Sequence, residues 1–317
     1  MKNIKTVTIG IPAHNEEANI GKLLDSIKIQ IGKEFILEKV IVACDGCTDN
    51  TNSIVKSYSK KYKIIKLIDD GKRFGKPERL NNFYKMNTSD ILIIFDADTV
   101  LGSPFVINEF AKAFKNSEIG LVGGNDTPQI PKNFVQKMAA VWIDVWYESR
   151  VDFNEGVTVN NHKGCASALS RSLCKKMEIP KEIVVGDEDY VYFKAKLLGY
   201  KFKFAKKAIV YYSVPSTVNE FFVQTTRFLN TKNDIAKYFG DWIYKEFKIP
   251  NIRKVRALFI VFIKEPFYLP IAIMFQVFQR FFEFKYKDNY RHIFVKRASS
   301  FRWSVACRLC TTMPNRV

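Results

Sequence analysis

The chain has 317 residues, of which 47% are hydrophobic and 26% are charged, and 50 Lys and Arg residues against 32 Asp and Glu residues give a formal net charge of +18. This length and composition allow one large or two smaller folded domains and exclude intrinsically disordered, collagen-like and low-complexity chains. The positive charge requires an anionic partner, for which nucleic acid, phosphate-bearing substrates and acidic lipid are the candidates.

Short apolar runs alternate with helical patterns in the first half of the chain. We expect strands in five runs rich in Val and Ile, at 7–12, 40–44, 64–68, 91–95 and 121–122. Helical patterns lie between them at 16–30, 51–61, 76–86 and 104–114. Strands separated by helices predict right-handed crossovers and a mostly parallel sheet flanked by helices. This half is therefore predicted to be an α/β domain of the nucleotide-binding type.

Acid-rich segments follow three of the predicted strands, at 13–17, 45–50 and 96–98. In open α/β sheets the ligand lies beyond the carboxyl ends of the strands. The sequence contains neither G-x-G-x-x-G nor G-x-x-x-x-G-K-[ST], so dinucleotide and P-loop sites are not favoured. Asp96 and Asp98 can instead turn toward one divalent cation, which would join them to a diphosphate. A solvated turn or a helix cap is the alternative for this pair taken alone.

The remaining pattern predicts helices at 131–150, 186–199 and 218–239, and a strand or loop at 163–173. The composition then changes, because residues 241–317 hold 15 Lys and Arg against 5 Asp and Glu, which is +10 of the total +18. We therefore divide the chain into a domain at 1–240 and a basic, aromatic helical segment at 241–317.

Two apolar stretches, 257–263 and 266–279, lie within this basic segment. The longer one would extend ~21 Å as a helix, which is too short to span a hydrocarbon core of ~30 Å by itself. Basic residues flank both stretches, and aromatic residues fill them. This pattern is typical of a helix in the headgroup region of an anionic membrane. A tilted or paired transmembrane segment and a buried or oligomer-contact helix are the alternatives.

The six cysteines include two C-x-x-C pairs, Cys44–Cys47 and Cys307–Cys310. Two such pairs can form a tetrahedral zinc site. The first pair, however, follows a buried-strand pattern at the start of an Asp/Gly/Asn turn, so we do not favour zinc. The N-terminus carries no signal-peptide pattern, and we expect the reducing cytosol as the compartment.

Four motifs, in this order and spacing, resemble family 2 glycosyltransferases of the GT-A fold. They are TIGIPAHNEE at 8–17, DGCTDNT at 45–51, GKPERLN at 75–81 and DAD at 96–98. The resemblance covers about residues 5–230 and implies that 1–240 is a GT-A catalytic domain. It implies an inverting transfer of a sugar from a nucleoside-diphosphate sugar to a hydroxyl or phosphate of an acceptor.

The resemblance also implies which residues bind the nucleoside. Pro12, Ala13 and Glu16 would line the nucleoside pocket, and Asp45 would contact the base. A carboxylate at that position can accept the imino N–H of uracil or guanine. A UDP-sugar is the favoured donor and a GDP-sugar is the alternative.

Phosphate and metal contacts are implied for a second set of residues. Lys76 would face the base or the diphosphate, with Arg79 as further positive charge. Asp98 would bind Mn²⁺ or Mg²⁺, and Asp96 would bind the ribose or the same metal. The segment QTTRF at 224–228 resembles a Q-x-x-R-W signature, so Gln224 would border the acceptor channel and Arg227 would neutralise the leaving diphosphate.

The catalytic base is implied to lie in the run Asp187-Glu188-Asp189. An inverting transfer needs one carboxylate opposite the leaving group to take the acceptor's proton. The spacing to the following Gly-Tyr indicates Glu188, whereas direct residue matching indicates Asp189, and all three acids remain candidates. Charge complementing a helix macrodipole is the alternative explanation for acids at this position.

Two other functions compete with this prediction. A nucleotidyltransferase acting on sugar phosphates would carry a first loop rich in Gly and basic residues, whereas residues 12–16 contain no Gly. A basic nucleic-acid-binding protein would explain the net charge, but no recognition motif accompanies it. The favoured prediction is a metal-dependent hexosyltransferase for a saccharide or lipid-linked acceptor, with no nucleic-acid partner. We expect it at the cytoplasmic face of the cell membrane, in cell-envelope polysaccharide biosynthesis.

Overall fold

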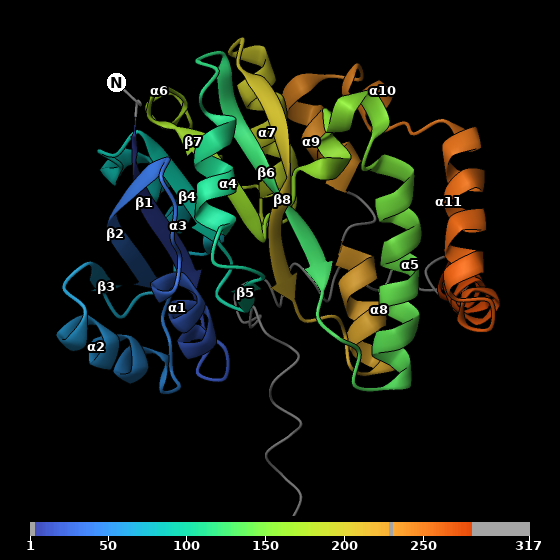
Figure 1. The fold of residues 1–317 in the computed structure, drawn as a ribbon, viewed down its shortest axis with the longest axis horizontal. Helices are drawn as coiled ribbons and strands as arrows, with labels where there is room; N and C mark the ends of the chain where they lie inside the picture. The colour runs from blue at the N-terminus through green and yellow to red at the C-terminus, as the bar shows by residue number, and fades with distance from the viewer. Residues whose placement is uncertain (1–3, 228–230, 281–317) are drawn as a thin grey trace, which may run out of the picture.

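A computed structural model describes residues 4–227 and 231–280 of the chain. Its centre is one eight-stranded mixed sheet in the order β3-β2-β1-β4-β7-β6-β8-β5 (Figure 1). The strands are β1 (Lys5–Ala13), β2 (Phe35–Cys44), β3 (Ile65–Asp69), β4 (Ile91–Phe95), β5 (Thr99–Leu101), β6 (Ile119–Pro128), β7 (Ala166–Ser170) and β8 (Lys201–Tyr212). Four of the seven neighbouring strand pairs are parallel, so the predicted α/β fold with a mostly parallel sheet is confirmed.

Helices cover both faces of this sheet (Figure 1). They are α1 (Ile20–Lys28), α2 (Thr51–Lys61), α3 (Lys76–Met86), α4 (Val106–Ala113), α5 (Phe134–Arg150), α6 (Arg171–Cys174), α7 (Asp187–Leu197), α8 (Val218–Arg227), α9 (Thr231–Phe239), α10 (Ile243–Glu246) and α11 (Asn251–Lys264). Two short 3₁₀ turns follow α5, η1 (Phe153–Gly156) and η2 (Val159–Asn161). Residues 268–280 form a further helix after α11.

The strand β4 shows why the sheet is buried on both faces. Its side chains alternate, so that Ile93 and Phe95 pack against α1 and α4 on one face while Leu92 and Ile94 pack against α3 on the other. All five residues of this strand are buried. A continuous apolar run is what a central strand with two covered faces requires.

Two strands, β5 and β8, were not predicted. In β8 the residues KFKFAKKAIVYY bury Phe202 and Phe204 and expose all four lysines. The first residues of β8 therefore do show the apolar–polar alternation typical of a strand. The strand was missed because four lysines within 12 residues are more typical of a solvent-exposed loop. The strand β5 has only three residues and pairs antiparallel with β8.

The buried Asn81 of α3 links this helix to the segment that leads into α7. Its Nδ2 donates to the carbonyl oxygen of Ile179 at 2.8 Å, and its Oδ1 accepts from the Ile179 N–H at 2.8 Å. A loop backbone that is held by both of its polar groups is fixed in register. Asn81 thereby helps to set the position at which α7 begins.

The described part of the basic segment packs on the rest of the chain. α11 lies beside α5 (Figure 1), where Ala257 and Val261 pack with Met138 and Val141 in a small third core. The helix at 268–280 adds Leu269 and Ala272 to this core. Among residues 4–227 and 231–280, no helix combines the length and apolarity that crossing a membrane needs. The basic residues that were counted beyond position 280 lie outside the described part of the chain.

Candidate active site

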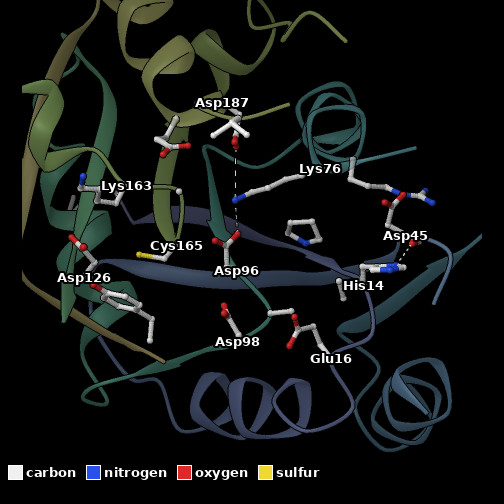
Figure 2. A pocket seen from close by; sticks show the side chains of 18 of the residues that line it. His14, Glu16, Asp45, Lys76, Asp96, Asp98, Asp126, Lys163, Cys165 and Asp187 are labelled. Carbon is white, nitrogen blue, oxygen red and sulfur yellow. Dashed lines mark hydrogen bonds and ion pairs between the residues drawn. The ribbon is translucent and has the colours of Figure 1, made fainter. Parts of the chain in front are cut away.

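A pocket of about 330 Å³ opens at the carboxyl ends of β1, β2 and β4 (Figure 2). This is the edge of the sheet at which the sequence predicts a ligand. The predicted site residues that line the pocket are Pro12, Ala13, Glu16, Asp45, Lys76, Asp96, Asp98, Asp187, Glu188 and Gln224. Of the other two, Asp189 is absent from the lining, and the side chain of Arg227 at the end of α8 lies outside the described structure.

Asp45, at one end of the pocket, organises the loop before α3. Its carboxylate accepts the backbone N–H groups of Phe74 at 2.7 Å and Gly75 at 3.0 Å, and the Nε–H of Arg79 at 3.0 Å. A carboxylate has about four acceptor positions. Bonds within the protein already use three of these acceptor positions. The contact of Asp45 with a nucleobase stays a prediction, and it would have to use the fourth position.

Arg79 also lines the pocket, and its guanidinium group is bound within the loop before α3, so a contact with the donor's phosphates stays a prediction. Its Nη1 and Nη2 bind the two carboxylate oxygens of Asp70, each at 2.8 Å, and Nη2 also donates to the carbonyl oxygen of Lys72 at 2.7 Å. The side chain is 1% exposed. Together with the bond to Asp45, these contacts direct the whole guanidinium group into the loop.

His14 lies beside Asp45 in the pocket wall (Figure 2). Its Nδ1–H donates to the carbonyl oxygen of Asp45 at 2.6 Å. Burial lowers the pKa of this imidazole below its ordinary value. The neutral ring therefore supports the backbone of Asp45 and has a structural part in the pocket wall.

Three carboxylates face one another in the middle of the pocket: Glu16, Asp96 and Asp98 (Figure 2). Burial, followed by the charge of Asp98, raises the pKa of Glu16 to about 8. Burial, followed by the charge of Asp96, raises the pKa of Asp98 to about 6. The protein thus gathers three carboxylates in one buried place, which is a setting for a bound cation.

The oxygen atoms of this carboxylate cluster suit Mg²⁺ or Mn²⁺, which prefer oxygen ligands and keep phosphate or water in part of their coordination shell. Within the described residues, no group of three or more His, Cys, Asp and Glu side chains is arranged to hold a metal ion by itself. A cation at Asp96 and Asp98 would therefore take its other ligands from a diphosphate and from water. The pair Cys44 and Cys47 belongs to no such group, and Cys307 and Cys310 lie outside the described residues.

Lys76 connects the carboxylate cluster to the start of α7. Its Nζ lies 2.7 Å from Oδ1 of Asp96 and 3.8 Å from Oδ2 of Asp187 (Figure 2). Burial alone would lower the pKa of Lys76, but the carboxylates of Asp96 and Asp187 hold it above its ordinary value. This side chain, 7% exposed, therefore carries a fixed positive charge into the centre of the pocket.

The three consecutive acids at 187–189 point to different surroundings. Asp187 and Glu188 line the pocket, whereas Asp189 lies under the electrostatic influence of Lys163 and Lys232. Burial, followed by the charge of Asp187, raises the pKa of Glu188 to about 8. A Cβ atom at Gly164 would lie 3.1 Å from Nζ of Lys76 and 3.6 Å from Oε2 of Glu188. Gly164 thus keeps open the space between these two charged groups.

His162 is a positioning residue beneath Glu188 that the sequence analysis did not identify. Its Nδ1–H donates to the backbone carbonyl oxygen of Glu188 at 2.8 Å, and Nε2 accepts from the hydroxyl of Ser167 at 2.7 Å. Burial lowers the pKa of His162 to about 4, so the ring is neutral. No motif signals this contact, because 26 residues separate the two partners.

A buried ion pair lies at one end of the pocket, where β6 forms the wall. Nη2 of Arg150 lies 3.3 Å from Oδ1 of Asp126, and Nη1 of Arg150 donates to Oδ1 of Asn161 at 2.5 Å. Asp126 lines the pocket with Cys165 and Tyr212 (Figure 2). No sequence motif predicts this wall, because its residues come from three separate elements: β6, α5 and β8.

Comparison with known proteins gives three findings. The model of a family described as Glycosyl transferase family 2 matches residues 8–178, which is more than half of the chain. The probable glycosyltransferase YdaM of Bacillus subtilis is 24% identical over 273 residues, which is 83% of this chain and 63% of that protein. The poly-beta-1,6-N-acetyl-D-glucosamine synthase of Staphylococcus epidermidis is 22% identical over 237 residues, 74% of this chain and 56% of that protein. The chain thus spans less than two thirds of the length of either relative.

Among solved structures, a mannosyltransferase of Pyrobaculum calidifontis in complex with GDP-Man and Mn²⁺ superposes with a TM-score of 0.56. The two chains are 21% identical, and the match covers 86% of this chain and 74% of the mannosyltransferase chain. At this identity the likeness concerns the fold alone. It confirms the predicted fold of the GT-A type.

Proposed function

Because this chain belongs to glycosyl transferase family 2, we propose that it transfers a sugar from a nucleoside-diphosphate sugar to an acceptor, with inversion at the anomeric carbon. One observation carries the proposal. The same pocket brings the carboxylate pair Asp96 and Asp98 within reach of Glu188, and Lys76 lies between them. Groups for a leaving diphosphate and for an attacking hydroxyl thus face one volume.

Each of these residues has a role that follows from its surroundings. Asp96 and Asp98 would hold Mn²⁺ or Mg²⁺, which supplies charge stabilisation to the departing diphosphate when it is bound. Glu188 accepts the proton of the acceptor hydroxyl as that oxygen attacks the anomeric carbon. Its raised pKa of about 8 makes it a stronger base than an ordinary carboxylate. Lys76 orients Asp96 and contributes a fixed positive charge beside the diphosphate.

The donor nucleotide is proposed to be UDP, with GDP as the alternative. The loop held by Asp45, together with Pro12 and Ala13, would form the nucleoside end of the pocket. The mannosyltransferase with the same fold is in complex with GDP-Man, so both nucleotides belong in the test.

Thermal unfolding of the full chain with UDP, GDP and their sugars, each with and without Mn²⁺, tests this proposal. We expect one nucleoside diphosphate to raise Tm only when Mn²⁺ is present, by an amount equivalent to about 2.7 kcal/mol at a hundredfold excess over Kd. The corresponding sugar nucleotide should then be hydrolysed slowly. Stabilisation by single- or double-stranded DNA or RNA, with none by any nucleotide, would instead support the nucleic-acid-binding alternative.

We further propose that the C-terminal helices place the enzyme on the cytoplasmic face of an anionic membrane. α11, the helix at 268–280 and the turn between them expose many large apolar side chains: Ile252, Val255, Phe259, Phe262, Ile263, Phe267, Met274 and Val277. Exposed Lys254 and Arg256 lie on the same helix α11. An apolar surface combined with basic residues favours the headgroup region of acidic lipid. A lipid-linked acceptor in cell-envelope polysaccharide synthesis would suit this location.

Sedimentation with phosphatidylcholine vesicles, with and without phosphatidylglycerol, measures this association. We expect binding that requires phosphatidylglycerol and weakens as salt is added. The double variant Phe259→Ser/Phe267→Ser should bind at least about tenfold more weakly, because each inserted Phe contributes about 1.5–3 kcal/mol. Ile31→Ser/Phe105→Ser, which removes exposed apolar side chains elsewhere, should bind as the parent does. Equal losses in both double variants would contradict the assignment of this surface.

A further inference from the structure

A second groove, of about 690 Å³, lies among α5, α9, α10 and the beginning of α11. It combines three lysines with aromatic side chains. We refer to it as the basic groove, and its defining residues are Trp146, Lys232, Tyr244, Phe247, Lys248 and Lys254. None of these residues belongs to the motifs on which the proposed function rests.

The lysines of the basic groove have no carboxylate partners among the residues that the structure describes. No described carboxylate lies within 4.0 Å of Nζ in Lys232, Lys248 or Lys254, and Lys254 donates to the amide oxygen of Asn251 at 3.4 Å. Burial lowers the pKa of Lys232, while the carboxylate of Asp189 acts in the opposite direction. The positive charges of Lys254 and Lys163 lower this pKa further. An anion in the groove would relieve this repulsion.

The aromatic side chains give the groove a second property. Trp146 is 41% exposed, although its indole ring is large and apolar. Nζ of Lys232 lies 4.7 Å from the ring centroid of Phe247, so the ammonium group is held beside an aromatic wall. Exposed indole rings present an apolar face and a polar N–H to a ligand. A pyranose ring, with its apolar face and its hydroxyl edge, matches such a surface.

The basic groove adjoins the side of the active site where the base lies. Lys163 lines the catalytic pocket, and its charge acts on Lys232 in the groove and on Asp189. Thr231, at the start of α9, packs so closely against Gly186 that a Cβ atom there would collide with it. The start of α9 therefore lies directly against the start of α7. An acceptor must approach Glu188 from the side opposite the leaving diphosphate.

We propose that the basic groove binds a phosphorylated saccharide acceptor, with its phosphate at Lys232, Lys248 and Lys254 and a sugar ring on Trp146. This inference rests on the proposed function, because it names the substrate class that would meet Glu188. The phosphate can belong to a soluble sugar phosphate or to a lipid headgroup that carries the glycan. Both sources present the same anion to the lysines.

The direct test is a binding titration observed at Trp146. The full chain is labelled with 5-fluorotryptophan, and the ¹⁹F resonance of Trp146 is assigned among the four tryptophans with Trp146→Phe. Glucose 6-phosphate is the soluble probe, and glucose is its uncharged control. Phosphatidylglycerol-containing vesicles, compared with pure phosphatidylcholine vesicles, supply the lipid phosphate.

We expect glucose 6-phosphate or the phosphatidylglycerol vesicles to shift the Trp146 resonance saturably, with no shift from the matched control probe. Lys232→Gln/Lys254→Gln should weaken this binding at least about tenfold, since two charge-assisted hydrogen bonds to the phosphate are lost. Lys60→Gln/Lys66→Gln removes the same charge from exposed lysines elsewhere and should leave binding unchanged. The responding probe identifies the source of the phosphate.

Three results would overturn the proposal: no shift with either anionic probe, an equal shift with glucose, or equal losses in the two double variants. The titration needs no donor and no turnover. Its failure is therefore distinct from failure of the proposed function, which the nucleotide-dependent rise in Tm reports separately.

Discussion

Replacing Glu188 with Gln is expected to lower kcat for sugar transfer by about 10²- to 10⁴-fold, which is the usual contribution of a general base. The amide keeps the size of the side chain but does not accept the proton of the acceptor hydroxyl. The rise in Tm caused by nucleoside diphosphate and Mn²⁺ should remain, because Glu188 is not among the residues proposed to hold the nucleotide or the cation. Transfer and donor hydrolysis assays, run beside thermal unfolding, measure the two effects independently.

Asp189→Asn is the matched control, because it removes a neighbouring carboxylate that does not line the pocket. We expect it to reduce kcat less than tenfold. A loss in Asp189→Asn as large as that in Glu188→Gln, or nearly full activity in Glu188→Gln, would contradict the assignment of the base and return all three acids to consideration.

The pH dependence of kcat follows from the same group. Glu188 acts as a base only when it is deprotonated, and burial with the charge of Asp187 raises its pKa to about 8. The rate should therefore increase as the pH rises toward about 8 and level off above it. In Glu188→Gln the residual rate should lose this rise. A parent rate that is constant from about pH 6 to about pH 8 would exclude a base with this pKa.

Replacing Asp98 with Asn is expected to lower transfer by about 10²- to 10³-fold, the range seen when one group that stabilises developing charge is removed. The substitution keeps the shape of the side chain and removes one carboxylate from the cluster that it forms with Asp96 and Glu16. Without ligands the variant should be at least as stable as the parent, because repulsion within the cluster is reduced. The Mn²⁺-dependent part of the nucleotide-induced rise in Tm should disappear.

Asp25→Asn provides the control for this prediction. Asp25 is an exposed carboxylate of α1 that pairs with Lys28 at 2.9 Å, and its removal changes the net charge by the same amount. We expect unchanged transfer and an unchanged response to Mn²⁺. Asp98→Asn with parental turnover, or with a full Mn²⁺ response, would show that the cation does not depend on this carboxylate.

Local sequence patterns predicted the central elements of the fold well. The bounds of β4 at 91–95, α2 at 51–61 and α3 at 76–86 agree with the structure. Each is an apolar run or helical pattern that is bounded by turn-forming or capping residues, so the residues inside and outside the element differ in their backbone preferences. The strand β8 was missed because its place beside the short edge strand β5 lets its lysines reach solvent, and a segment so rich in charge does not resemble a buried strand.

Arg79 shows where local patterns were insufficient within the site. A basic residue in a motif that faces a nucleotide was expected to bind phosphate. In the structure the loop before α3 brings Asp70 and Asp45 to its guanidinium group, and the bidentate pair with Asp70 occupies both terminal nitrogens. The sequence contained all three residues but not the curvature of the loop that joins them.

Residue preferences along the chain were enough to predict which acids gather at one edge of the sheet. Parallel strands bring their carboxyl ends to one edge, so Glu16, Asp45, Asp96 and Asp98 had to meet there. Which acids of 187–189 line the pocket depends on packing between distant segments. Successive helical residues point about 100° apart, so α7, packed against α9, turns Asp187 and Glu188 to the pocket and leaves Asp189 out of its lining. The basic groove likewise depends on contacts between α5, α9, α10 and α11, which come together only through their shared apolar cores.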